Sequence, residues 1–196
     1  MEAGRLAWRG ESVIVGEASD AETVVLDPLP VQRPHPPLWV AAFGPKALAQ
    51  AGRLGLPYLA SPVETLLTLT DNYSRHTSAA EEAGNSRVET VPIMRTVFVA
   101  KNRRLGDAVR ARVVEQARQT PSVARRQDAG SESADDWCII GDAGYVSDRI
   151  AEYREQLSVT HLIVTRLRIN GLESEAIQHS LEQVPELVAN IRGVEF

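Results

Sequence analysis

Residues 38–60 read LWVAAFGPKALAQAGRLGLPYLA, and this stretch decides the architecture of the chain. Residues 38–43 are continuously apolar, which is typical of a strand buried on both faces of a parallel sheet. Pro45 then stands where a first helical residue would, and Gly55 can end the helix in the left-handed conformation. The run 57–60 is short and apolar again. The segment therefore predicts strand, helix and strand in direct succession.

This alternation continues along the rest of the chain. Ser61 followed three residues later by Glu64 is a capping-box pattern, which predicts a helix from there to about Ala83. Further strands are predicted over 91–100 and 161–169, and further helices over 105–119, 146–157 and 177–191, the last bent or reset at Pro185. Buried strands alternating with helices indicate a parallel α/β sheet or barrel. A full (β/α)8 barrel takes about 250 residues, so the roughly four units seen in these 196 residues predict an α/β fold that is a partial TIM barrel.

Two other segments differ from this pattern. Residues 12–15 and 23–26 are β-rich runs separated by turn-forming residues, so residues 1–30 are predicted to form a small β-hairpin that leads into the barrel units. Residues 120–136 are polar with little periodicity, and we expect a mobile loop there. The whole chain, 1–196, is interpreted as one domain.

Composition restricts the function. A net charge of −5 leaves no basic footprint for nucleic acid, and no apolar stretch reaches the length of a membrane span, so we expect neither partner. The N-terminal residues lack a signal-peptide core and Cys138 is the one cysteine, so a cytoplasmic location and a buried, inert thiol are expected. The four histidines show no metal-ligand spacing, and no metal site is predicted.

The exit of the 38–43 run is the first candidate site. In a barrel of this type ligands lie at the carboxyl ends of the strands, and the N–H groups that follow Pro45 would point out of the helix start, a ready anion site. Lys46 in the first helical turn opposes the helix dipole by about 0.3–1 kcal/mol. A bound phosphate would offset that penalty, whereas a lysine that simply points into solvent is the alternative.

Two longer stretches carry a family resemblance. PLPVQRPHPPLWVAAFGPKALAQAGRLGLPYLAS (28–61) combines a proline-rich lead-in with an apolar strand and a helix start, and it resembles the central segment of the bacterial luciferase-like monooxygenase family. The stretch IIGDAGYVSDRIAEYREQLSVTHLIV (139–164) is similar to that family's second common segment, in which a helix precedes the last barrel strand. The resemblance covers about residues 8–190 and implies the C-terminal half of a flavin-dependent (β/α)8 barrel.

Carried onto this sequence, the resemblance implies a site for reduced flavin mononucleotide (FMN), with a deazaflavin as a further possibility. The flavin ring would be lined by Ala41, Ala42 and Phe43 and bordered by Ala60 and Ser61, and the phosphate would be held by Gly44, Pro45, Lys46 and Ala47. The sequence departs from the luciferase α-subunit pattern, because Phe43-Gly44 replaces an acidic-serine pair and Ala47 replaces a threonine. Fewer side chains would therefore contact the phosphate.

Two further arginines are anion candidates. Arg166 and Arg168 share one face near the end of the 161–169 strand, where they could bind an anionic substrate or the flavin phosphate. A salt bridge to Glu173 or Glu175 is the favoured alternative. Arg95 lies within the 91–100 strand, and a charge there needs a partner if it is buried.

The resemblance also implies partners and an activity. Family members use reduced flavin, O2 and a small organic substrate, and some depend on a flavin reductase. The catalytic residues of the family lie on the first four strands, which have no counterpart in this sequence, so none can be assigned and turnover by the lone chain is not expected. A homo-oligomer or a complementing half-barrel chain is the predicted assembly. A non-catalytic flavin-binding or dimerisation module is the alternative function.

Overall fold

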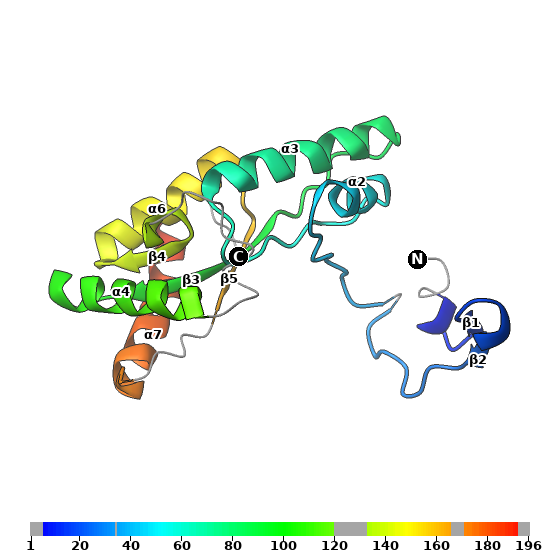
Figure 1. Ribbon diagram of the computed structural model, residues 1–196, viewed down its shortest axis with the longest axis horizontal. Coiled ribbons are helices and arrows are strands. Elements are labelled where there is room, and N and C mark those ends of the chain that lie inside the picture. The colour runs from blue at the N-terminus through cyan, green and yellow to red at the C-terminus, as the bar shows by residue number, and fades with distance from the viewer. Residues whose placement is uncertain (1–5, 34, 120–132, 166–170, 192–196) are drawn as a thin grey trace. The chain divides into compact units, whose positions relative to one another are not determined.

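The computed structural model describes residues 6–33, 35–119, 133–165 and 171–191. They belong to two compact units, Met1–Leu38 and Trp39–Phe196, which are described separately (Figure 1). Residues 166–170 and most of the predicted loop, 120–132, lie outside the described residues.

The first unit contains the predicted hairpin. Strands β1 (Val13–Val15) and β2 (Glu22–Val24) pair antiparallel, and the short 3-10 helix η1 (Ala18–Asp20) connects them. Gly16 has a φ of +100°, a conformation that a side chain strongly disfavours, and this is why the turn begins with glycine. The hairpin predicted over 12–15 and 23–26 is confirmed, with three-residue strands of which the second starts one residue earlier than predicted.

A three-stranded parallel sheet forms the centre of the second unit. Its order is β4–β3–β5, where β3 is Pro92–Val99, β4 is Cys138–Gly141 and β5 is His161–Val164. The predicted strand 91–100 is confirmed as β3, and the described part of 161–169 as β5. The sequence reading missed β4, because its apolar run is only three residues long and cannot be told from a loop by periodicity.

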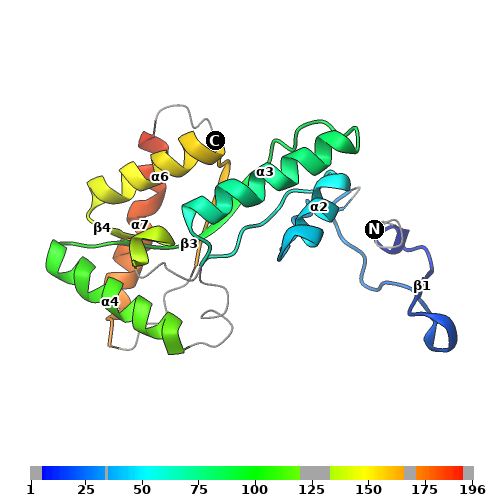
Figure 2. The ribbon, with the colours of Figure 1, turned by 45° about the horizontal axis from the view of Figure 1, so that its top comes forward.

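Helices cover both faces of this sheet. Those that contact it are α4 (Arg103–Gln119), α6 (Ala143–Leu157) and α7 (Ser174–Asn190). The unit also contains α2 (Pro45–Arg53), α3 (Leu66–Glu82) and the 3-10 helix η2 at Ala134–Asp136. Figure 2 shows α4 and α6 on opposite sides of β3 and β4. The alternation of β3 explains this, because Val97 packs in one core with α6 and α7, whereas Phe98 packs in a second core with α4.

The prediction that 38–43 is a strand buried on both faces is wrong in this structure, and neither 38–43 nor 57–60 forms a continuous strand. They are extended segments joined by single parallel bridges, Val40 to Tyr58 and Ala60 to Ile93. Along 38–43 the burial alternates, with Ala42 buried and Phe43 51% exposed. In the described part of the unit, one face of this extended segment is covered by the core and the other is open.

Two helix boundaries also differ from the prediction. Helix α3 starts at Leu66, one turn after Ser61, because Thr65 is the cap that accepts a hydrogen bond from the N–H of Thr68 at 3.1 Å. Helix α7 begins at Ser174 and continues through Pro185 to its end. The last residues of the predicted mobile loop, 133–136, form η2 and its cap.

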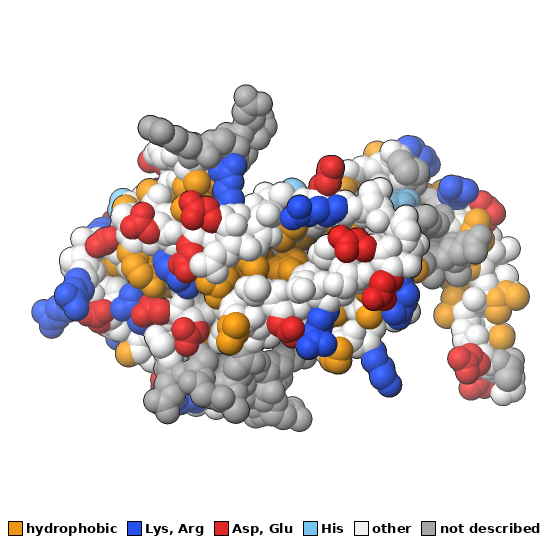
Figure 3. All heavy atoms as spheres, turned by 90° about the horizontal axis from the view of Figure 1, so that it is seen from above, with side chains coloured by type: hydrophobic (Ala, Val, Ile, Leu, Met, Phe, Trp, Pro, Cys, Tyr) orange, Lys and Arg blue, Asp and Glu red, His pale blue; other side chains and the backbone are white. Residues whose placement is uncertain are grey.

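Charged side chains are distributed rather than gathered. On the face shown in Figure 3, Lys and Arg alternate with Asp and Glu, and apolar side chains are exposed between them. None of the helices in the described ranges is long and apolar enough to cross a membrane.

Candidate functional site

The start of α2 has the geometry expected of an anion-binding corner. Gly44 is the N-cap with φ 82° and ψ 165°, Pro45 occupies the first turn, and no side chain caps the helix. The first N–H groups of a helix have no intrahelical acceptor, so those of Lys46 and Ala47 point outward from the helix start. A positive φ at the cap explains why glycine stands there.

This corner is open to a ligand. Phe43, Gly44, Pro45 and Lys46 are all exposed, and Ala47 is half-buried. A Cβ placed on Gly44 would meet no atom within 4 Å, so there is room beside the cap. An exposed cation and outward N–H groups beside open space are suited to a phosphate. The residues present therefore fit the phosphate end of a flavin nucleotide.

The other end of α2 is firmly held. Gly55 adopts the predicted left-handed conformation with φ 64°. The Asn85 side chain donates hydrogen bonds to the carbonyl oxygens of Gly52 and Arg53, at 3.1 and 2.9 Å. These bonds satisfy carbonyls that the end of a helix leaves unpaired.

The extended segment that leads into this corner runs parallel to the strands of the sheet. The bridges of Val40 with Tyr58 and of Ala60 with Ile93 are parallel, as are the ladders of β3 with β4 and β5. The segment before α2 therefore runs toward the carboxyl side of the three strands. In α/β barrels that carboxyl edge carries the active site.

Ala60, which pairs with Ile93 near the start of β3, and the next residue, Ser61, are both buried. Ala60 is 1% exposed and Ser61 7%. The N–H of Ser61 donates to the Glu64 carboxylate at 2.8 Å, and that carboxylate also accepts from Tyr58 Oη at 2.7 Å and from Asn72 Nδ2 at 3.2 Å. These hydrogen bonds hold the turn that follows residues 57–60. Ala60 and Ser61 are therefore buried, whereas the residues at the start of α2 are exposed.

Arg95 holds this turn from β3. Its guanidinium is fully buried and donates to the carbonyl oxygens of Ser61 and Glu64, each at 2.9 Å, and to Met94 at 2.8 Å. It also donates to Tyr153 Oη at 3.0 Å and lies 4.9 Å from the centre of that ring. The buried charge of Arg95, which the sequence predicted to need a partner, therefore interacts with carbonyl oxygens and an aromatic ring.

Burial also sets the protonation of nearby phenols. Desolvation raises the pKa of Tyr58, and the adjacent Glu64 carboxylate raises it further. Desolvation likewise raises the pKa of Tyr73, whose hydroxyl donates to the carbonyl oxygen of Pro92 at 2.8 Å. Both phenols are therefore neutral hydrogen-bond donors at physiological pH, which suits a structural role.

The remaining histidines and arginines considered as site residues can be described briefly. His76 is buried and its Nε2 lies 2.8 Å from the carbonyl oxygen of Leu56, whereas His161 begins β5 with its ring edge-on to Trp39. Arg166 and Arg168 lie outside the described residues. Across the described ranges, no cluster of His, Cys, Asp or Glu side chains could hold a metal ion.

Cys138 is buried in β4, and desolvation raises the pKa of its thiol. We expect a disulfide reagent at pH 8 to modify the native thiol at least about 100-fold more slowly than the thiol of the urea-unfolded chain, because the reactive thiolate is disfavoured and covered. Since the pKa is higher in the folded state, this thiol's contribution to stability is full below the unfolded value of about 8.5 and falls as the pH rises above it. Equal modification rates in the two states would contradict this assignment.

Comparison with known proteins identifies the family. The sequence model of the luciferase-like monooxygenases matches residues 1–161, most of the chain. The chain belongs to the luciferase-like monooxygenase family. A comparison with curated proteins finds no significant match.

Several solved structures are similar to this chain in fold. The monooxygenase RslO1 from Streptomyces bottropensis is 20% identical with a TM-score of 0.68, covering 96% of this chain and 58% of RslO1. The oxygenating constituent of 3,6-diketocamphane monooxygenase from Pseudomonas putida, solved with FMN, is 17% identical with a TM-score of 0.65, covering 93% of this chain and 59% of that one. An F420-dependent secondary alcohol dehydrogenase is 18% identical with a TM-score of 0.56, covering 82% and 52%. This luciferase-like chain thus spans under three-fifths of these proteins' lengths and matches part of their fold.

The sequence reading missed the network around the buried turn. The capping-box pattern predicts the bond between Ser61 and Glu64, but it does not predict that the Glu64 carboxylate also accepts hydrogen bonds from Tyr58 and Asn72. The one available signal was Arg95, a charge within an apolar strand that demanded acceptors. Which carbonyls it reaches depends on contacts between residues more than 30 positions apart, which no local pattern encodes.

Proposed function

We propose that the chain supplies the FMN-phosphate corner of a luciferase-like flavin-dependent monooxygenase that acts on a small organic substrate with O2. The observation that carries the proposal is the open, uncapped start of α2 at the carboxyl edge of a luciferase-like fold. The similar 3,6-diketocamphane enzyme was solved with FMN, which supports the choice of cofactor.

Each residue of the corner has a proposed role. The N–H groups of Lys46 and Ala47 would donate to phosphate oxygens, and the Lys46 ammonium would add a charge-assisted bond. Gly44 leaves space for the phosphate, and the exposed Ala41 and Phe43 would face the flavin ring, with Ala42 packed behind them. Ala60 and Ser61 would form the wall beside it, held by Arg95.

Reduced FMN, when bound, supplies the electrons for oxygen activation, and a flavin reductase would provide it in that form. The residues of this chain bind and orient the nucleotide. A complementing half would have to contribute the groups that contact the substrate, so flavin binding without turnover is the expected behaviour of the lone chain.

A deazaflavin is the second candidate cofactor. It is supported by the similarity to the F420-dependent secondary alcohol dehydrogenase. Both cofactors carry a phosphate after the ring-bound chain, so the α2 corner would serve either, and the chemistry would then be hydride transfer rather than oxygenation.

Titration with two flavins tests the corner. We expect FMN to bind about tenfold or more tightly than riboflavin, which lacks the phosphate, because a charge-assisted hydrogen bond contributes about 1.5–3 kcal/mol. Replacing Lys46 with Glu should remove this preference by placing a negative charge beside the phosphate. Quenching of flavin fluorescence measures both dissociation constants.

The control variant is Arg87→Glu. It makes the same change of charge at an exposed site before the amino end of β3, and it should leave the ratio of FMN to riboflavin affinity unchanged. Equal affinity of the wild-type chain for FMN and riboflavin would refute the proposed corner. A titration with F420 in place of FMN decides between the two cofactors.

A further inference from the structure

We infer that the hydroxyl groups of Thr96 and Thr165 form a binding site for the carbonyl oxygen of a small, otherwise apolar substrate. The assignment as a substrate site rests on the proposed function as a flavin-dependent monooxygenase, and it adds one contact that this chain itself makes with the substrate. The site is defined by the direction of the side chains on β3 and β5 and by a hydrogen atom that the two hydroxyls leave unbonded.

The two threonines lie on the face of the sheet opposite α6 and α7. Side chains alternate along a strand, and the neighbouring Val97 and Val164 pack in the core with these helices. Thr96 and Thr165 therefore point to the other face, where their Oγ1 atoms lie 2.8 Å apart. Both residues are half-buried, so a small molecule can reach them.

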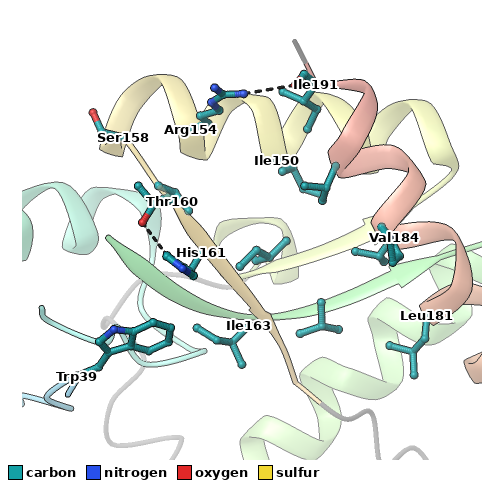
Figure 4. A pocket seen from close by; sticks show the side chains of 15 residues that line it. Trp39, Ile150, Arg154, Ser158, Thr160, His161, Ile163, Leu181, Val184 and Ile191 are labelled. Carbon is teal, nitrogen blue, oxygen red and sulfur yellow. Dashed lines mark hydrogen bonds between the residues drawn. The ribbon is translucent and has the colours of Figure 1, made fainter. Parts of the chain in front are cut away.

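Apolar side chains adjoin the pair on this face. Met94 and Ile163 stand two residues before Thr96 and Thr165, so they share the face, and both are half-buried. Figure 4 shows Ile163 on the side of β5 that faces Trp39, beside a cavity of about 1010 Å³ that runs along the strand. A ligand on this face would therefore contact mainly carbon atoms, with the two hydroxyls as the polar contact at this end.

The pair has one more hydrogen atom than its own hydrogen bond uses. A threonine hydroxyl donates one hydrogen and accepts through its lone pairs. One of the two hydroxyls donates to the other, and the hydrogen of the accepting group has no acceptor among the described residues. A carbonyl oxygen complements this donor, because it carries two lone pairs and no hydrogen.

The pair lies on the same side of the sheet's bridge residues as the proposed phosphate corner. The parallel bridges place Ala42, Ala60 and Ile93 in one row across the sheet. Thr96 stands three residues beyond Ile93 toward the carboxyl side, the direction in which residues 43–45 lead into α2. A substrate held at the pair would therefore lie on the side of this row on which the flavin phosphate is proposed to bind.

Titration with a ketone and its hydrocarbon isostere tests the site without flavin. The probes are cyclohexanone and methylenecyclohexane, in which a C=CH2 group replaces the carbonyl. The chain carries carbon-13 in its threonine and isoleucine methyl groups, and NMR follows their signals. We expect both probes to shift the Ile163 signal, and cyclohexanone to bind about threefold or more tightly and to shift the Thr96 and Thr165 signals. No binding of cyclohexanone, or equal affinity for the two probes, would overturn the inference.

Valine variants identify the hydroxyls as the cause. The double variant Thr96→Val, Thr165→Val removes both hydroxyls and keeps branched side chains that suit a strand, so it should fold and bind the two probes equally. The control is Thr70→Val, at an exposed position on α3 where the hydroxyl donates to the carbonyl oxygen of Leu66 at 2.9 Å. This control should keep the preference for the ketone. A preference that persists in the folded double variant would contradict the assignment.

A carbonyl of the flavin ring can use the same donor, and riboflavin distinguishes this case. A double variant that loses affinity for riboflavin but keeps the ketone preference would assign the hydroxyls to the flavin ring and overturn the inference. A ketone preference that depends on the hydroxyls, in a chain that does not prefer FMN to riboflavin, would support the carbonyl site while refuting the proposed cofactor corner.

Discussion

Replacing Arg95 with alanine is expected to lower the free energy of unfolding by about 3–5 kcal/mol, the range typical of breaking a buried charged network. The guanidinium is fully buried and donates to three carbonyl oxygens and to Tyr153 Oη. Alanine removes the guanidinium donor from all of these acceptors. Each buried group left unsatisfied costs about 1–3 kcal/mol, and a cavity adds to the loss.

Urea unfolding followed by circular dichroism measures this loss. Arg103→Ala is the control, because the Arg103 side chain is 95% exposed and its ion pair with Asp107 is long, at 3.8 Å. It should change stability by less than about 0.5 kcal/mol. Arg95→Lys keeps the charge but loses the planar fork that reaches several acceptors, so its effect should be intermediate. A loss at Arg95→Ala no larger than at Arg103→Ala would show that the network is not a stabilising one.

The same variant bears on the candidate site. Arg95 fixes the carbonyls of Ser61 and Glu64, and this turn is the one that we propose as the wall beside the α2 corner. The sequence could indicate that a strand arginine needs acceptors, but not which ones. Residues 34 and 31 positions earlier supply two of them, and the fold alone brings these together.

Some features could be predicted because the residues that determine them lie close together in the sequence. The amphipathic pattern of α4, with Val109, Val113 and Ala117 on one face, matches the observed buried face. The left-handed Gly55 and the cap at Gly44 also follow from the sequence. The prediction that 38–43 is buried on both faces was wrong. An apolar run shows that a segment is able to be buried, but it does not show whether other parts of the fold cover both of its faces.

Replacing Gly52 with alanine should lower the free energy of unfolding by about 2–3 kcal/mol, even though alanine is the better helix former by about 1 kcal/mol. Gly52 is buried where α2 crosses α3. A Cβ there would lie inside van der Waals contact of the carbonyl oxygen of His76 and 3.1 Å from the amide nitrogen of Ala80. Both atoms belong to the α3 backbone and cannot rotate away, so the two helices must separate.

Gly106→Ala is the matched control for this change. It is also a helical glycine, but a Cβ there would meet the Ala100 side chain at 3.4 Å, close to ordinary contact. The gain in helix propensity should then leave stability unchanged or raise it by up to about 1 kcal/mol. In thermal unfolding, the melting temperature should fall for Gly52→Ala and should stay the same or rise for Gly106→Ala. Because α2 also carries the proposed phosphate corner, displacing it at Gly52 should weaken FMN more than riboflavin, and an unchanged ratio of the two affinities would separate helix packing from the site.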